Sequence, residues 1–530
     1  FEYFKLSTDD YLYILDNYFP FLSEKERLEY YHTIKGQLSA YFSFLSRQLV
    51  DHPEYASLLY NTHIRTKAIL LSESVKLRNF LNNHQDEKVK QIYVQWNAIN
   101  GEIAKLDQTK NEGDKKVYLD SLKIVGEEYE RVLNSLTQKS IKPKNITWID
   151  VSARLNDGEV AVEIIRIKEF DFEKNEHSNE RISYLALIID NETKGAPSFI
   201  RLDEGFLLDS KYFNVYKNNI KYKLEDKVSY EKFWKHIAEK LSGYKKIYFS
   251  SDGVYHLINL NTLYNTTTSK YVIEESNIEI VGNTAEILNK KSTYLKPENA
   301  TLFGFPNFNA KPDKDSHDTL RTSIYRDIFT AGVSDLPGTK VEVSNINKLM
   351  NSAGVSTSSF LSDDAHESNL KEITAVDILH IATHGFFEES SADVVNDDPL
   401  THSGLLLANI KESTDIQEEN GIITAKEVAQ LDLAGNKLVV LCACETGKGK
   451  VVDGEGVYGL QRAFQVAGAD NVIISLWKVD DEATQKLMTY FYEFYLQSNN
   501  ARDALRHAQT TLQVDYSHPN YWGAFYVIGN

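Results

Sequence analysis

The sequence has very few cysteines. Its 530 residues include only Cys442 and Cys444, which one residue separates. Two neighbouring thiols cannot build a disulfide framework, so the composition suits a reducing compartment and we expect a cytoplasmic protein. Their closeness raises a different question, namely whether one of them is a chemical reagent.

Long apolar runs are also missing. No stretch approaches the roughly 20 apolar residues that a membrane-spanning helix needs. The start, Phe1-Glu2-Tyr3, has neither a basic region nor an apolar signal core. We therefore expect no direct membrane insertion. Because an initiator methionine is absent as well, we expect a processed piece of a longer chain.

Concentrated positive charge is scarce. The formal net charge is -18, and basic runs such as residues 142–144 and 448–450 are short. Phosphate binding needs a concentrated positive face, so we expect no broad direct nucleic-acid surface. The chain is 42% hydrophobic and 12% aromatic, which is enough for two or three buried cores.

Residues 1–140 have a helical pattern. In residues 25–49 and 89–106, apolar side chains recur every three to four positions, without strand-like alternation. This pattern predicts a helical scaffold or partner-docking module. A clean 34-residue repeat is not visible, so a helical-repeat architecture is compatible with the sequence but not demonstrated by it.

Two α/β units are predicted after the helical module, over residues 147–294 and 298–530. In the first, strand-like runs at 160–165, 184–189 and 246–250 alternate with helical stretches such as 230–241. This alternation is typical of a largely parallel sheet flanked by helices. In the second unit we expect strands at 300–303, 378–383, 437–442 and 471–476, and helices at 457–466, 483–496 and 501–512.

Two predicted strands end in residues that can carry chemistry. One apolar run stops at His384-Gly385, and another ends near Cys444, shortly before Gly447. Ligands of open α/β sheets bind at the carboxyl ends of the strands. A thiol is mostly protonated at neutral pH, so a nearby imidazole is needed as its base. The backbone N–H groups of Gly385 and Cys444 can then hold a developing oxyanion.

Each of these residues also has an ordinary structural interpretation. A buried cysteine is usually a small hydrophobe, and a histidine after a strand is usually just hydrogen-bonded. Of the two thiols, Cys442 falls within the apolar run, whereas Cys444 stands at its end. We therefore expect Cys444 to be the nucleophile and Cys442 to be a structural neighbour.

Other chemistries fit the sequence less well. Residues 447–450 lack the upstream glycine and the following Ser/Thr of a phosphate loop. The two cysteines have no second ligand pair at zinc-binding spacing, so no metal and no cofactor are expected. The acidic run at residues 453–456 is too short for a known calcium loop and is more typical of a solvated turn.

Several motifs in the last third of the chain together resemble the CHAT family, the bacterial caspase-like peptidases related to caspases and separase. The upstream stretch 248–253 resembles the family's first, non-catalytic half, and the helical part resembles the end of the tetratricopeptide arrays that often precede CHAT domains. The motifs, in chain order, are Ala382-Thr383-His384-Gly385, residues 403–408, Ala443-Cys444-Glu445-Thr446-Gly447, residues 454–464, 467–469, 475–481 and His518-Pro519-Asn520-Tyr521-Trp522.

The resemblance implies a caspase-like fold and a catalytic dyad at His384 and Cys444, which cleaves a peptide bond through a thioester without a metal. The family more often has Ser where this chain has Cys442. By analogy with separase, Asp481 would read a basic residue before the cut. The other interpretation is that Asp480 or Asp481 caps the following helix. The expected substrate-binding set comprises Asp481, Asp480, Trp477 and Glu455.

Two functions follow as hypotheses. In the first, the chain is a regulated endopeptidase of bacterial defence or signalling, activated by a protein or ribonucleoprotein that docks on the helical module. In the second, it is a catalytically silent scaffold that acts by protein–protein interaction. The intact His384 and Cys444 favour the first hypothesis.

Overall fold

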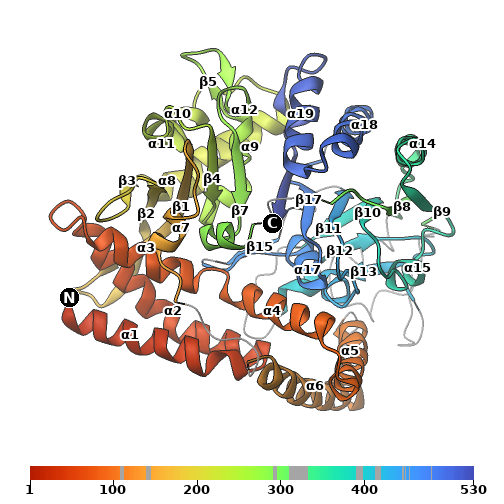
Figure 1. The fold of residues 1–530 in the computed structure, drawn as a ribbon, viewed down its shortest axis with the longest axis horizontal. Helices are drawn as coiled ribbons and strands as arrows, with labels where there is room; N and C mark the ends of the chain where they lie inside the picture. The colour runs from red at the N-terminus through yellow and green to blue at the C-terminus, as the bar shows by residue number, and fades with distance from the viewer. Residues whose placement is uncertain are drawn as a thin grey trace.

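The structure is a computed structural model that places three parts in chain order (Figure 1). We call them the helical module, the first α/β unit and the second α/β unit. The residues that the structure describes are 1–107, 113–138, 145–290, 295–308, 332–388, 398–411, 419–443, 447, 449–452, 454–478 and 480–529.

The helical module confirms the helical pattern of the sequence. Its second helix begins at a capping box, in which the Ser23 hydroxyl accepts from the Glu26 N–H and the Glu26 carboxylate accepts from the Ser23 N–H. Its helices are α1 (Glu2–Asn17), η1 (Phe19–Phe21), α2 (Glu24–Arg47), α3 (Tyr55–Thr66), α4 (Ile69–Asn83), α5 (Glu87–Asp107) and α6 (Asp114–Gln138).

The first α/β unit contains a five-stranded sheet in the order β3-β2-β1-β4-β7. The pairs β1–β4 and β4–β7 are parallel, whereas β1–β2 and β2–β3 are antiparallel, so a long hairpin extends one side of the parallel part. The expected helix at 230–241 is divided in two at Trp234, whose φ of -126° leaves the helical region. The elements are α7 (Trp148–Ser152), β1 (Glu159–Asp171), β2 (Glu176–Asp190), β3 (Ser198–Leu202), α8 (Gly205–Leu207), η2 (Leu208–Tyr212), α9 (Phe213–Tyr222), α10 (Ser229–Phe233), α11 (Lys235–Lys240), β4 (Lys246–Ser250), η3 (Gly253–Leu257), η4 (Leu260–Thr262), β5 (Tyr264–Asn265), β6 (Lys270–Tyr271), α12 (Val272–Glu275), β7 (Ile278–Val281) and η5 (Thr284–Asn289).

The second α/β unit contains a six-stranded sheet in the order β18-β17-β14-β10-β8-β9. All neighbouring strands are parallel except β17–β18. The elements of its first half are β8 (Asn299–Pro306), α14 (Pro337–Ser352), β9 (Ser356–Ser362), α15 (Glu367–Lys371), β10 (Ile378–Ala382), β11 (His384–Phe387), η6 (Pro399–His402), β12 (Ser403–Leu406), β13 (Ile422–Thr424) and α16 (Ala425–Val428). Those of its second half are β14 (Leu438–Cys442), β15 (Lys450–Val452), β16 (Gly456–Tyr458), α17 (Leu460–Ala467), β17 (Asn471–Ser475), α18 (Asp481–Ser498), α19 (Ala501–Leu512), α20 (Pro519–Trp522) and β18 (Phe525–Gly529).

The expected helix at 457–466 is wrong at its start. Val457 and Tyr458 belong to β16, which pairs with β15, and α17 begins only at Leu460. The pairing partner lies earlier in the chain, so helical spacing alone did not reveal the strand.

Both faces of the second unit's sheet are buried, as the apolar strand sequences predict. Along β14, Val439 and Leu441 point into one core and Leu438, Val440 and Cys442 into the other. Helices α14, α18 and α19 contribute to the second core. The first core also receives apolar side chains from α1, α2 and α4, so the helical module packs directly against the second unit.

In the described part of the chain, no helix combines the length and the apolarity that crossing a membrane requires.

Candidate active site

His384 lies just beyond the carboxyl end of β10, where the chain turns into β11. The preceding residue, Thr383, is buried, and its hydroxyl donates to the Leu406 carbonyl of the neighbouring strand β12. The His384 Nε2 atom is 2.8 Å from the Ser334 carbonyl oxygen. Because a carbonyl only accepts, Nε2 must carry the proton, and Nδ1 of the neutral ring is then the basic nitrogen.

The surroundings of His384 keep its ring neutral. Burial lowers the pKa of His384 below its usual value, and the charge of Lys478 acts in the same direction. The Ser334 carbonyl and the carboxylate of Asp481 oppose this shift without reversing it. A neutral imidazole can accept a proton at physiological pH, which a general base must do.

The second strand end is that of β14, beside β10 in the same sheet. The strands are parallel, and their last residues, Ala382 and Cys442, are register partners. Since His384 follows Ala382 by two positions and Cys444 follows Cys442 by two, the two predicted catalytic residues occupy equivalent positions after neighbouring strands. Cys444 itself lies outside the described residues.

Ser475 holds both flanks of the segment that carries Cys444. Its hydroxyl donates to the Ala443 carbonyl oxygen at 2.6 Å, and its own carbonyl accepts from the Gly447 N–H at 2.7 Å. A Cβ atom at Gly447 would lie 3.0 Å from the Ser475 carbonyl oxygen, closer than side chains usually approach. The glycine therefore permits this close approach.

Cys442 lies in a buried polar cluster that the sequence did not predict. The cluster joins it to Glu342 of α14 and His380 of β10. The His380 Nε2 atom is 3.1 Å from a Glu342 carboxylate oxygen, and its Nδ1 is 3.1 Å from the Tyr492 hydroxyl. Burial raises the pKa of the Cys442 thiol, and the Glu342 carboxylate raises it further. Cys442 is therefore a protonated, unreactive thiol, as expected of a structural neighbour.

The same cluster has ligand types that suit zinc. One ligand atom from each of Glu342, His380 and Cys442 lies within 4.8 Å of the others. A closed structural zinc site takes four ligands. Within the described residues, the His380 Nε2 and Glu342 Oε1 atoms face each other at 3.1 Å, and neither has a hydrogen-bond partner. The only clue in the sequence was a histidine, His380, within an otherwise apolar strand.

The two aspartates at the start of α18 have different roles. The Asp480 carboxylate accepts from the N–H groups of Glu482 and Ala483, both at 3.1 Å, and so caps the helix. Asp481 is exposed in the first turn, and its charge acts on His384. Of this pair, therefore, Asp481 is the residue whose charge acts on His384.

The other two predicted substrate-binding residues lie in packed surroundings. The Trp477 indole N–H donates to the Asn520 carbonyl at 3.0 Å. Glu455 is buried rather than solvated, because its carboxylate faces the Leu70 N–H of α4 and the Arg462 guanidinium. Burial raises the pKa of Glu455 to about 7 against the opposing charge of Arg462.

Gly385 of the expected oxyanion site lies in β11 and pairs with Leu405 of β12. Gly385 directly follows His384 in the chain. The part that the Gly385 N–H plays in oxyanion binding stays a prediction.

The fold and site define a protein with a helical module, two α/β units and a histidine at the carboxyl edge of the second sheet. A model of the CHAT domain matches residues 228–530. This match covers more than half of the sequence, and the chain belongs to the CHAT domain family.

Curated relatives match only part of the chain. Tetratricopeptide repeat protein 28 of Homo sapiens is 38% identical over 111 residues, which are 21% of this chain and 4% of that protein. The Mus musculus protein of the same name is 34% identical over 111 residues, with the same coverage. The chain thus spans a very small share of these relatives' length.

Two solved structures are remotely similar. The Arg specific cysteine proteinase gingipain R has a TM-score of 0.35 and 12% identity, over 60% of this chain and 75% of that one. The Saccharomyces cerevisiae separase–securin complex has a TM-score of 0.39 and 9% identity, over 87% of this chain and 37% of that one.

Proposed function

We propose that the chain is a cysteine endopeptidase with Cys444 as its nucleophile and His384 as its base. The observation that carries this proposal is the register of β10 and β14. Ala382 and Cys442, the last residues of these strands, are register partners, and each predicted catalytic residue follows one of them by two positions in the sequence, which supports a shared edge. The Ser334 carbonyl supports the proposal because it fixes the ring tautomer that a base needs.

The proposed reaction has two steps. In the first, His384 Nδ1 accepts the Cys444 thiol proton, and the thiolate attacks the scissile carbonyl carbon. The N–H groups of Gly385 and Cys444 stabilise the tetrahedral oxyanion. The C–N bond then breaks, and the imidazolium gives its proton to the leaving amine. In the second step, water deprotonated by His384 cleaves the thioester, which releases the acid and the free thiol.

Specificity is proposed to come from Asp481. This residue is exposed and acts electrostatically on His384, while Asp480 is occupied by the helix cap. A carboxylate beside the site pairs well with a guanidinium, so we propose Arg or Lys before the cut. Trp477 and Glu455 are proposed to contribute less directly, because Trp477 is partly buried and Glu455 is fully so.

Control of the enzyme is proposed to involve the helical module. An activating protein or ribonucleoprotein would dock there, in a cytoplasmic pathway of bacterial defence or signalling. The support is the packing of α4 against α17 of the second unit, within a buried cluster that also includes apolar side chains of α1 and α2.

The test is turnover of a fluorogenic peptide library by the wild type, Cys444→Ala and Cys442→Ser. We expect Cys444→Ala to lower kcat/KM by about 10³-fold or more, because no other group replaces the nucleophile. Cys442→Ser is the matched control: its hydroxyl keeps the contact with Glu342, so activity should stay within about threefold of the wild type. A wild type that cleaves no peptide and whose Cys444 is not labelled by a thiol-reactive peptide would support the silent scaffold instead.

A further inference from the structure

The corner between α3 and α4 of the helical module contacts both α/β units. Helix α3 ends at Thr66 and α4 begins at Ile69, with Lys67 and Ala68 between them. Ala68 has a φ of 54°, in the left-handed region, which turns the chain sharply. No side chain of this corner caps α4, so its first N–H groups need partners from elsewhere.

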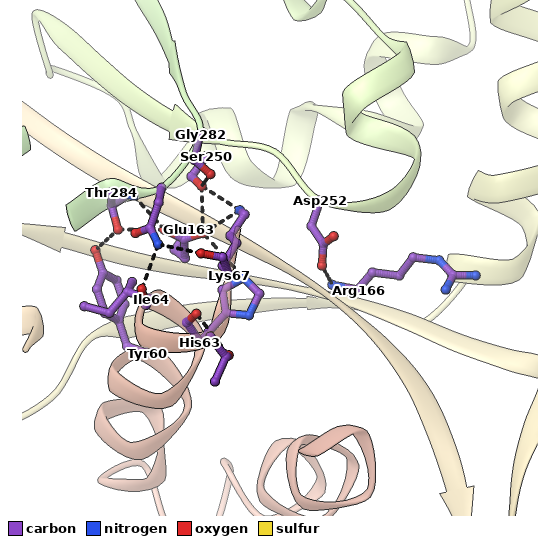
Figure 2. Close-up of polar contacts among 12 residues, drawn as sticks. Tyr60, His63, Ile64, Lys67, Glu163, Arg166, Ser250, Asp252, Gly282 and Thr284 are labelled. Atoms are coloured by element: carbon purple, nitrogen blue, oxygen red, sulfur yellow. Dashed lines mark hydrogen bonds and ion pairs between the residues drawn. The ribbon is translucent and has the colours of Figure 1, made fainter. Parts of the chain in front are cut away.

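One side of the corner is fixed to the first α/β unit. The buried Lys67 ammonium lies 2.6 Å from a Glu163 carboxylate oxygen of β1 and 2.6 Å from the Ser250 hydroxyl of β4. Figure 2 shows these three side chains converging between α3 and the sheet. The Asn283 amide also donates to the Ile64 carbonyl at 2.7 Å. Because the Lys67–Glu163 pair is fully buried, this side of the corner is expected to be rigid.

The other side of the corner is held by the hairpin β15–β16 of the second α/β unit. The Ala68 N–H donates to the Gly454 carbonyl at 2.7 Å, and the Leu70 N–H donates to the Glu455 carboxylate at 3.3 Å. A carboxylate at a helix N-terminus is stabilised by the free N–H groups and the helix dipole. Glu455 therefore supplies, from another part of the chain, the cap that α4 lacks.

Glu455 is itself oriented within the second unit. Its second carboxylate oxygen accepts from Arg462 of α17 at 3.4 Å, and both side chains are buried. Its neighbours Gly454 and Gly456 have φ values of 77° and 79°, which suit glycine. This tight turn lets the Glu455 side chain point at α4 while β15 and β16 stay paired.

The hairpin directly follows the proposed nucleophile in the chain. Strand β15 begins at Lys450, six residues after Cys444. Between them, a Cβ atom at Gly449 would lie 2.1 Å from the Tyr458 carbonyl oxygen of β16, so the backbone there is in close contact with the hairpin. A shift of the hairpin would therefore move Gly449, which follows Cys444 by five positions in the sequence.

A small cavity of about 70 Å³ lies at this junction. Its lining includes Lys67 from the corner, His256 from the first unit, and Glu455 and Arg462 from the second. The His256 Nε2 atom is buried and has no hydrogen-bond partner among the described residues. The junction is thus less tightly packed than the cores around it, and side chains there have room to rearrange.

We propose that Glu455 is a positioning residue that joins the α3–α4 corner to the segment carrying Cys444, so that the helical module controls the reactivity of this thiol. This inference rests on the proposed function, because it names the regulation of the same site. A partner that displaces the corner would remove the cap from α4, release the hairpin and so change the rate at which Cys444 reacts.

The test uses the full chain with Cys442→Ser, in which Cys444 is the only thiol. Because the pKa of Glu455 is raised to about 7, the measurements are made at about pH 8, where its carboxylate is charged. Glu455→Gln keeps the size of the side chain but removes this charge, and Glu455→Asp keeps the charge but shortens the reach. We measure hydrogen exchange of residues 69–72 and 450–458 and the rate of Cys444 alkylation by iodoacetamide. In both variants, exchange should rise about fivefold in both segments, and the alkylation rate should change by about threefold or more.

The matched control is Glu87→Gln. Glu87 is also in the first turn of a helix, α5, but its side chain is 77% exposed and pairs with Lys90 of the same helix. This variant should change neither measurement. If exchange rises in α4 while the hairpin and the alkylation rate stay as in the parent, the cap is local and the proposal is wrong.

Alkylation and exchange need no substrate, so this test is separate from that of the peptidase. If the wild type cleaves no peptide but the Glu455 variants shift both measurements, the coupling of the α3–α4 corner to Cys444 through Glu455 is supported, and the proposed peptidase function fails. If the wild type cleaves peptides and the Glu455 variants leave the hairpin and alkylation unchanged, the coupling alone fails.

Discussion

At the scale of single residues, burial drives two side chains near neighbouring strand ends to opposite chemistries, although His384 is half-buried and Cys442 is buried. Burial disfavours the charged form of any group. It therefore keeps His384 neutral and basic, and it keeps the Cys442 thiol protonated and unreactive. The same physical cause leaves the His384 ring without its second proton and prevents the Cys442 thiol from competing as a nucleophile.

The pKa of His384 gives the first prediction. Because it is lowered below the ordinary value of 6.5, the ring should stay neutral as the pH falls through 6.5 and gain its proton only at lower pH. Unfolded chains take up that proton earlier, so this residue's contribution to stability is present above pH 6.5 and is lost as the pH falls. NMR titration of histidine ring signals, with His384→Gln for assignment, measures the shift. A midpoint at or above 6.5 would contradict it.

The sequence could predict the residues that end strands, but not the ones that reach them from elsewhere. His384 was predictable because an apolar run stops there before a glycine. Ser334 and Glu342 were not, because their contacts with His384 and His380 join segments about 40 to 50 residues apart. Glu455 was predicted to lie in a solvated turn, since nothing local shows that a helix N-terminus covers it.

At the scale of elements, the start of α18 separates two adjacent aspartates. Asp480 caps the helix, whereas Asp481 lies exposed in its first turn. Asp480→Ala should lower the free energy of unfolding by about 1 kcal/mol, because two helix N–H groups lose their acceptor. Asp481→Ala should change it by less than about 0.5 kcal/mol, as exposed substitutions usually do. Urea unfolding followed by circular dichroism compares the two, and equal losses would refute the assignment of the cap.

Buried strands were the most predictable elements. The apolar runs at 378–383 and 437–442 correspond closely to β10 and β14, because a strand that is covered on both faces has a nearly continuous apolar sequence. Strand β16 was not predictable in the same way. It exists through pairing with β15, and two glycines bracket its short run. Pairing partners, not local spacing, decide such strands.

At the scale of the whole molecule, Arg502 of α19 joins the two sheets. Its guanidinium donates to the Ile280 carbonyl of β7 at 3.0 Å and to the Val527 carbonyl of β18 at 3.2 Å. Its Nε atom lies 3.0 Å from the Glu279 carboxylate. Ile280 and Glu279 lie more than 200 positions before Arg502 in the chain, so no sequence pattern could place the two units edge to edge.

The junction should therefore be sensitive to acid and to loss of Arg502. Burial would raise the pKa of Glu279, but the charges of Arg502, Lys290 and Lys246 lower it to about 2. A carboxyl group with a lowered pKa stabilises the fold above its unfolded value near 4.5, and this stability is lost as the pH falls toward 2. Removing the arginine should raise the pKa of Glu279, so that the protein loses this stability at a higher pH.

Arg502→Met should cost about 2–3 kcal/mol at neutral pH, because the nearly buried Glu279 loses one partner but keeps Lys246 and Lys290. Urea unfolding of Arg502→Met, Glu279→Gln and the double variant measures the coupling, and the double variant should cost less than the sum of the two. The control is Arg181→Met, whose ion pair with Asp171 is largely exposed and should contribute at most about 1 kcal/mol. If the stability losses of the two single variants add up strictly in the double variant, Arg502 joins the sheets through the Ile280 and Val527 carbonyls alone. The Glu279 carboxylate would then be stabilised by Lys246 and Lys290.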